Sequence, residues 1–174
     1  MNPVVLIGPP GSGKSVAGAL LARRLGVRFA DTDTAVERDS GKPVGDVFVE
    51  DGEPVFRELE RAAVARCLDT VSLEDGSGVV ALGSGAVLDP DVRRQISACT
   101  VVYLETGFAT IAKRTGMDRP RVVVPGNPRG MLRTMLEQRR PVYTELATIT
   151  VNADELSPEE LVLEIADKLP GSGS

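Results

Sequence analysis

The sequence predicts a three-layer α/β/α domain built around a five-stranded parallel β-sheet. Short apolar segments typical of buried strands alternate five times with longer segments whose apolar residues recur at helical spacing. Such alternation favours a parallel sheet with helices on both faces. No internal repeat or linker divides the 174 residues, so we expect a single domain over residues 1–170 and a disordered or engineered tail at 171–174.

The composition is that of an ordinary globular protein, and it excludes several functions. The chain is 42% hydrophobic, carries a net charge of −5 and contains neither His nor Trp. Catalysis by histidine and His-ligated zinc sites are therefore excluded. The acidic charge and the few aromatic residues argue against nucleic acid as a partner, and no apolar run is long enough to span a bilayer. We expect a cytoplasmic protein in which Cys67 and Cys99 are reduced thiols in the core.

A glycine-rich loop lies between the first predicted strand and the first predicted helix. Val4-Val5-Leu6-Ile7 predicts a buried strand, and Gly8-Pro9-Pro10-Gly11-Ser12-Gly13-Lys14-Ser15 fits the P-loop pattern G-x-x-x-x-G-K-[ST]. Glycines let the backbone curl around a phosphate group, which the N–H groups and the helix N-terminus stabilise. Lys14 would reach the β- and γ-phosphates, and the Ser15 hydroxyl would ligate Mg²⁺. A chance match in a glycine-rich turn is disfavoured because a strand and a helix flank the loop.

Two carboxylates end the second predicted strand. Residues 27–33 alternate apolar and polar side chains and close with Asp31-Thr32-Asp33. Because ligands of open parallel sheets bind beyond the carboxyl ends of the strands, both carboxylates would project toward the same site. One carboxylate near a metal ion and one near an acceptor hydroxyl would suit phosphoryl transfer to an alcohol. Capping of the next helix by Asp33 is an equally good explanation.

Helical spacing and turn residues describe the middle of the chain. They predict helices at 34–40, 44–51 and 53–68 and a loop at 69–78. A third strand at 79–82 ends in Gly83-Ser84-Gly85-Ala86. Glycine directly after a strand indicates backbone that approaches a ligand closely, although a simple tight turn remains the alternative.

The C-terminal half is predicted to alternate helices with two more strands. The expected elements are a helix that begins at Asp89-Pro90, a strand at 100–104, helices at 108–115 and 131–140, a strand at 148–151 and a helix that Ser157 caps. Pro and Gly residues between Gly116 and Arg129 predict a mobile lid over the site, at about 115–129. Eight Lys and Arg residues lie between residues 106 and 143 against two acidic residues. This excess of positive charge is either a solvated helix face or a means to enclose a nucleotide triphosphate.

Together these motifs resemble those of the shikimate kinase family, within the nucleoside-monophosphate-kinase-like P-loop class. The resemblance covers nearly the whole chain and implies the P-loop kinase form of the three-layer fold. It also implies ATP-dependent phosphorylation of the shikimate 3-hydroxyl, which gives shikimate 3-phosphate and ADP on the route to chorismate and the aromatic amino acids. We expect the protein to act as a monomer. The resemblance rests on an ordered set of motifs: Gly8 to Ser15, Asp31-Thr32-Asp33, Asp51-Gly52-Glu53, Phe56-Arg57-Glu58-Leu59-Glu60, Leu82-Gly83-Ser84-Gly85-Ala86, Arg119-Pro120 and Arg139-Arg140-Pro141-Val142-Tyr143.

The resemblance implies how the acceptor substrate is bound. Asp33 would hydrogen-bond the acceptor hydroxyl and take its proton. Arg57 and Arg139 would grip the shikimate carboxylate, because their forked donors match a planar carboxylate. Gly83 and Gly85 would place backbone N–H groups beside the substrate. Phe48 and Phe56 would form an apolar wall of the pocket. Glu60 would hold Arg57 in place.

The resemblance also implies how ATP and Mg²⁺ are bound. Mg²⁺ would be held by Ser15 and, through water, by Asp31. Arg114 would stack near the adenine, and Arg119 on the lid would close over the transferring phosphate and neutralise the charge that develops there. Transfer would be in line, with Lys14, Mg²⁺ and Arg119 stabilising the charge. The nucleotide would contact the loop residues Gly11, Ser12, Gly13, Lys14, Ser15 and Val16.

Three positions and one segment depart from the family pattern. Ser84 replaces the middle one of three glycines, Val16 replaces a Thr, and Arg121 stands where Leu is commoner. The segment Asn152-Ala153-Asp154-Glu155 stands where many members carry an adenine-facing Arg. Two alternatives therefore stay open: a gluconate-type or other sugar-acid kinase, and a nucleotide-binding regulatory protein that has lost catalysis, which Ser84 and Val16 would support.

Overall fold

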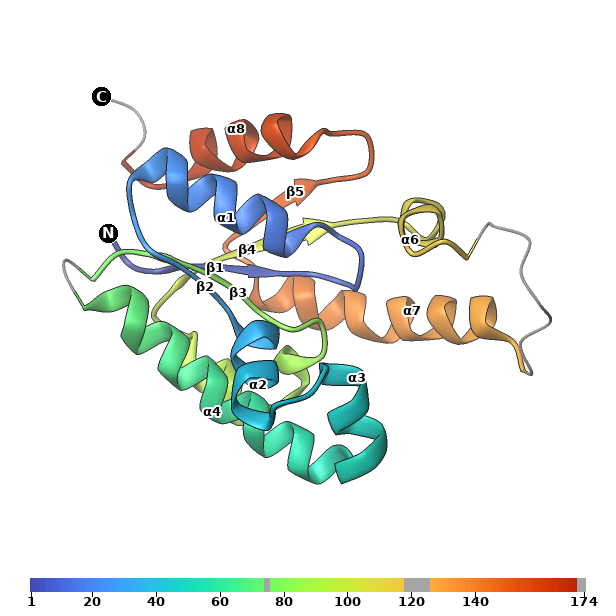
Figure 1. Ribbon diagram of the computed structural model, residues 1–174. Helices are drawn as coiled ribbons and strands as arrows, with labels where there is room; N and C mark the ends of the chain where they lie inside the picture. The colour runs from blue at the N-terminus through green and yellow to red at the C-terminus, as the bar shows by residue number, and fades with distance from the viewer. Residues whose placement is uncertain (74–75, 118–125, 172–174) are drawn as a thin grey trace.

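The computed structural model describes residues 1–73, 76–117 and 126–171 and confirms the predicted three-layer architecture (Figure 1). Within these residues, five strands form one parallel sheet in the order β2-β3-β1-β4-β5. Because all the pairings are parallel, the carboxyl ends of the strands meet at one edge of the sheet, where open α/β sheets bind ligands. The strands are β1 (Val4–Ile7), β2 (Phe29–Asp31), β3 (Val79–Ala81), β4 (Thr100–Glu105) and β5 (Ile149–Asn152).

The side chains of the central strand alternate between two helical layers. Val4 and Leu6 of β1 belong to the apolar cluster on one face of the sheet, and Val5 and Ile7 belong to the cluster on the other. This period of two is what a strand buried on both faces requires. The first face is covered by α1 (Lys14–Leu25) and α8 (Pro158–Lys168), and the second by α4 (Glu53–Ser72), α5 (Pro90–Gln95) and α7 (Pro128–Leu146) (Figure 1).

Shorter elements connect these layers. The predicted helix at 44–51 is divided into a single α-helical turn and a π-helical turn, and Gly52, with φ of 86°, separates that turn from α4. The predicted cap of the next helix by Asp89 is confirmed, since its carboxylate accepts the N–H of Asp91 at 2.8 Å. The short elements are α2 (Thr32–Ser40), α3 (Val44–Asp46), η1 (Val47–Asp51), η2 (Ala86–Leu88) and α6 (Phe108–Arg114).

The predicted strand at 27–33 was wrong at its carboxyl end. Strand β2 stops at Asp31 and α2 begins at Thr32, so Asp33 lies in the first helical turn. The cap is also Asp31 rather than Asp33, because the Asp31 carboxylate accepts the N–H groups of Asp33 and Thr34 at 2.9 and 3.2 Å. Those N–H groups have no partner within the helix, and a side-chain cap that satisfies them sets the point where the helix starts.

Two helices are longer than the sequence predicted. Helix α4 runs to Ser72 instead of residue 68, and α7 continues through Pro141 to Leu146. Proline removes a backbone hydrogen bond from a helix interior, which is why an end near residue 140 was expected. Packing on the sheet outweighs that loss, since Tyr143 is 1% exposed and stacks on Tyr103 with ring centroids 5.1 Å apart. Throughout the described ranges, no helix combines the length and apolar character needed to cross a membrane.

Candidate active site

The P-loop joins β1 to α1 at the carboxyl edge of the sheet. Gly11 and Gly13 have φ angles of 77° and 89°, a region that favours glycine, and Gly13 caps the N-terminus of α1. Lys14 folds back over the loop, and its ammonium group donates to the carbonyl oxygens of Gly8 and Pro9, each at 2.9 Å. Desolvation lowers the pKa of Lys14 to about 8, although the nearby carboxylates of Asp33 and Asp31 oppose that shift.

Ser15 and Asp31 place two side-chain oxygens next to each other beside the P-loop. The Ser15 hydroxyl donates a hydrogen bond to the Asp31 carboxylate, whose other oxygen is engaged in capping α2. The cap therefore turns one carboxylate oxygen toward Ser15. A hydroxyl and one carboxylate are a donor set that suits Mg²⁺, which usually takes few protein ligands together with phosphates and water. Among the described residues no group of three or more His, Cys, Asp or Glu could hold a metal by itself.

Gly83 lies against two carboxylates. A Cβ atom on Gly83 would be 2.7 Å from Asp33 Oδ1 and 3.1 Å from Glu60 Oε2, so a larger residue there would displace these carboxylates. Its N–H donates to the hydroxyl of the buried Thr32 at 2.9 Å, which ties the loop after β3 to the start of α2. Burial raises the pKa of Asp33, and the neighbouring Asp31 raises it further. Burial also raises the pKa of Glu60, even though Arg57 favours its charged form.

Two guanidinium groups converge on Gly85. A Cβ atom there would lie 3.0 and 3.1 Å from the terminal nitrogens of Arg57 and 3.3 Å from Arg139 Nη2. Arg57, on α4, is held by Glu60 at 2.6 Å and lies 5.3 Å from the centre of the Phe56 ring. Beside Arg57, Phe48 makes an edge contact with Phe56 at a centroid distance of 5.6 Å.

Arg114 links the P-loop to the segment that follows β5. Its guanidinium donates to the carbonyl oxygens of Gly11 and Ala153 at 3.0 and 3.1 Å. Asp154 in the same segment accepts the N–H of Gly107 at 2.8 Å. The segment that departs from the family pattern therefore lies beside the P-loop. Val16, at 55% exposure, is a solvent-facing residue of α1.

The structure thus brings together most of the residues that the sequence singled out. Asp33, Asp31 and Arg139 lie close enough to Lys14 to influence its pKa. Asp33 and Glu60 lie beside Gly83, and Arg57 and Arg139 lie beside Gly85. Arg119 and Arg121, and with them most of the expected lid, fall outside the described residues. The sequence motifs include Thr32 and Tyr143 but gave them no role, and no local signal could reveal that their hydroxyls hold the 83–85 loop across 51 and 59 residues.

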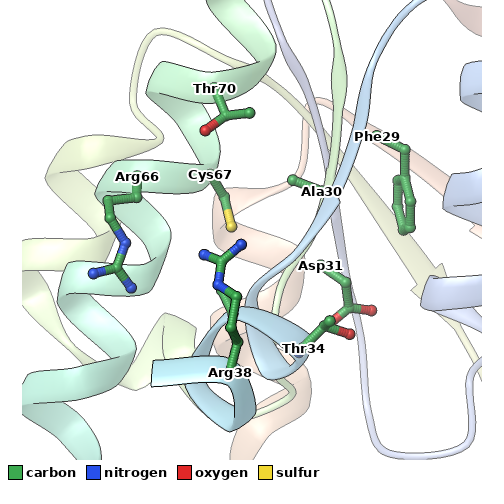
Figure 2. Close-up of a pocket in the computed structure, with 9 residues that line it drawn as sticks. Phe29, Ala30, Asp31, Thr34, Arg38, Arg66, Cys67 and Thr70 are labelled. Carbon is green, nitrogen blue, oxygen red and sulfur yellow. The ribbon is translucent and has the colours of Figure 1, made fainter. Parts of the chain in front are cut away.

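A separate cavity of about 300 Å³ opens between β2, α2 and α4 (Figure 2). Asp31 lies in its wall, and the Arg38 guanidinium and the Cys67 thiol face the hollow in Figure 2. Cys67 is a free, buried thiol, as expected from the sequence, and burial raises its pKa. Neither Lys14 nor the arginines at Gly85 line this cavity, so we do not assign the substrate to it.

Comparisons with known proteins give one consistent family. A family model described as shikimate kinase matches residues 10–170. The shikimate kinase of Thermobifida fusca is 50% identical over 97% of this chain and 95% of its own length, and that of Salinispora tropica is 46% identical over 98% and 99%. The solved shikimate kinase from Acinetobacter baumannii in complex with shikimate has a TM-score of 0.82 at 30% identity, over 98% of this chain and 96% of its own. A gluconokinase from Sinorhizobium meliloti, at 20% identity and a TM-score of 0.60, shares the fold alone.

Proposed function

The chain belongs to the shikimate kinase family of ATP-dependent kinases that act on shikimate, and we propose that the loop 83–85 and the P-loop together form its active site. In this site the γ-phosphate of ATP is transferred to the 3-hydroxyl of shikimate. The observation that carries the assignment is the convergence of Arg57 and Arg139 on Gly85, in the same group of charges as Lys14 and Asp33. An anionic acceptor and a phosphate donor would therefore be held side by side.

Shikimate binds through its carboxylate in this proposal. Two guanidinium forks above a glycine provide several N–H donors for one planar group, which is the arrangement that carboxylates prefer. Glycine at position 85 leaves the space that the substrate and the arginines share. The edge formed by Phe48 and Phe56 offers an apolar surface to the carbon ring of the substrate.

Asp33 orients the acceptor hydroxyl and takes its proton. Its raised pKa makes this carboxylate a better proton acceptor than an exposed aspartate, and the nearby Lys14 favours its charged form. Lys14 leaves its loop carbonyls and pairs with the phosphates when ATP is present. Arg114 would lie near the adenine, and Arg119, outside the described residues, would neutralise charge on the transferring group. Ser15 and, through water, Asp31 would hold Mg²⁺, which would offset the negative charge of the phosphates.

A coupled assay of ADP release tests this function. With ATP and shikimate we expect ADP to form in the presence of Mg²⁺. Chelation of the metal should abolish ADP formation. Gluconate and other hydroxylated acids serve as controls for the sugar-acid kinase alternative. A higher turnover on gluconate, or ATP binding without ADP production on any acid, would contradict the proposal.

A further inference from the structure

The two arginines at Gly85 are held in different ways. Arg57 has carboxylate partners, Glu60 at 2.6 Å and Glu53 at 3.6 Å. For Arg139, no carboxylate partner is found in the described part of the chain, and its Nη1 donates instead to the Ser84 hydroxyl at 3.3 Å. The charge of Arg57 is thus balanced by carboxylates, whereas Arg139 is oriented by neutral oxygens, namely the Ser84 hydroxyl and the Tyr143 hydroxyl.

Ser84 is itself fixed in place by the helix that carries Arg139. The Tyr143 hydroxyl, one helical turn beyond Arg139 on α7, donates to the backbone carbonyl of Ser84 at 2.6 Å. Burial raises the pKa of Tyr143 to about 12, so this hydroxyl remains a donor at neutral pH. On the other side of the loop, Gly83 is tied to Thr32. The Ser84 hydroxyl therefore stands at a defined position relative to Arg139.

We propose that Ser84 is a positioning residue that sets the Arg139 guanidinium for the substrate carboxylate. This inference rests on the proposed function, because it requires Arg139 to bind the carboxylate. A long arginine side chain loses rotamer freedom when it binds a ligand, and a hydroxyl that already holds it in place reduces that loss. Since the hydroxyl carries no charge, it orients Arg139 without competing with the carboxylate for the positive charge. The serine between the two glycines thus contributes to substrate affinity.

The test compares the effect of each substitution on the KM for shikimate with its effect on kcat and on the KM for ATP. Ser84→Ala and Ser84→Gly should raise the KM for shikimate about three- to tenfold, the size of effect expected for one hydrogen bond, and change kcat and the KM for ATP little. Ser84→Thr keeps the hydroxyl and should restore most of the affinity. Ser97→Ala is the matched control, because the exposed Ser97 bonds only the nearby carbonyl of Arg94 at 2.8 Å.

A double-mutant cycle separates this inference from a general structural role. In an Arg139→Ala background, Ser84→Ala should have almost no further effect, since its partner is gone. Additive effects, an unchanged KM for shikimate in Ser84→Ala, or an equal rise in the KM for ATP would overturn the proposal. Thermal unfolding of each variant shows whether the fold is intact, and Ser84→Gly provides the measurement if Ser84→Ala is unstable. A wild-type protein inactive on shikimate would overturn the proposed function as well, whereas an active wild type with an unaffected Ser84→Ala would overturn only the role of Ser84.

Discussion

Arg57 Nη1 lies 2.6 Å from Glu60 Oε1, and the Glu60 side chain is only 3% exposed. A buried carboxylate of this kind is costly unless it is paired, and its raised pKa reflects that cost. The pair does more than stabilise the fold, because it holds one of the two guanidinium groups over Gly85. A substitution of Arg57 therefore has two consequences, a loss of substrate affinity and an unpaired buried acid.

The first prediction separates these two consequences. Arg57→Ala should weaken shikimate binding by about 10- to 100-fold, the range for lost hydrogen bonds to a charged group, with far less effect on ATP binding. Isothermal titration calorimetry with each ligand measures this difference. Arg57→Ala combined with Glu60→Gln removes the unpaired charge, so it should recover stability but not shikimate affinity. Equal weakening of both ligands would count against a carboxylate site at Arg57.

The second prediction concerns Asp33. Asp33→Asn keeps the shape of the side chain but removes its charge and its ability to accept a proton. Turnover should fall by about 100-fold or more, as for loss of a general base, while ATP still binds. Steady-state assays of ADP release, with ATP binding measured separately, check this outcome. Near-normal turnover would refute the assigned role.

The third prediction uses the space above Gly85. In Gly85→Ala the new methyl group would lie 3.0 Å from Arg57 and 3.3 Å from Arg139, so both guanidinium groups would have to shift. The KM for shikimate should rise at least tenfold, as expected when the charge-assisted bonds to the carboxylate are misaligned. Gly45→Ala is the control, because the backbone there is helical and, in the described part of the chain, a methyl group would meet no heavy atom within 4 Å apart from those of its chain neighbours and its own helix backbone. Similar effects of the two substitutions on the KM for shikimate would exclude this role of Gly85.

The fourth prediction follows from the lowered pKa of Lys14. The pKa falls from 10.5 to about 8 in the free protein, so Lys14 is protonated below this pH and loses its charge as the pH rises through it. The affinity for ATP should therefore decline above about pH 8, approaching tenfold per pH unit if only the charged lysine binds the phosphates. Calorimetric titration with ATP between pH 7 and about 9.5 tests this window. An affinity that stays constant across it would show that Lys14 titrates elsewhere or does not bind phosphate.

The same pKa shift of Lys14 should make the free protein more stable as the pH rises, a trend opposite to that of the ATP affinity. Between pH 8 and 10.5 the unfolded chain binds a proton at Lys14 that the folded chain has lost, so the contribution of Lys14 to stability rises with pH in this window. Chemical unfolding at several pH values provides an independent check on the same pKa. A Lys14→Met variant should lack this contribution, because methionine has no proton to lose.

Local rules were enough to predict much of the fold and part of the site. The apolar run of β1, the glycines of the P-loop and the capping box of Ser157 and Glu160 each depend on residues that are close in sequence. The same rules were wrong where two local preferences compete. Asp31 and Asp33 could both cap a helix, and Pro141 favoured a helix end that the packing of Tyr143 overrides.

The sequence by itself determined the order of strands and helices, the phosphate-binding loop and the set of charged residues available for chemistry. Only the tertiary structure decided which of these charged and polar residues come into contact. The hydroxyl of Ser84 contacts Arg139 across 55 residues and Gly83 bonds Thr32 across 51. The reason is physical, since turns, caps and periodicity arise from interactions between near neighbours. The juxtaposition of loops at the sheet edge depends instead on the strand order and on how each helix packs against the sheet.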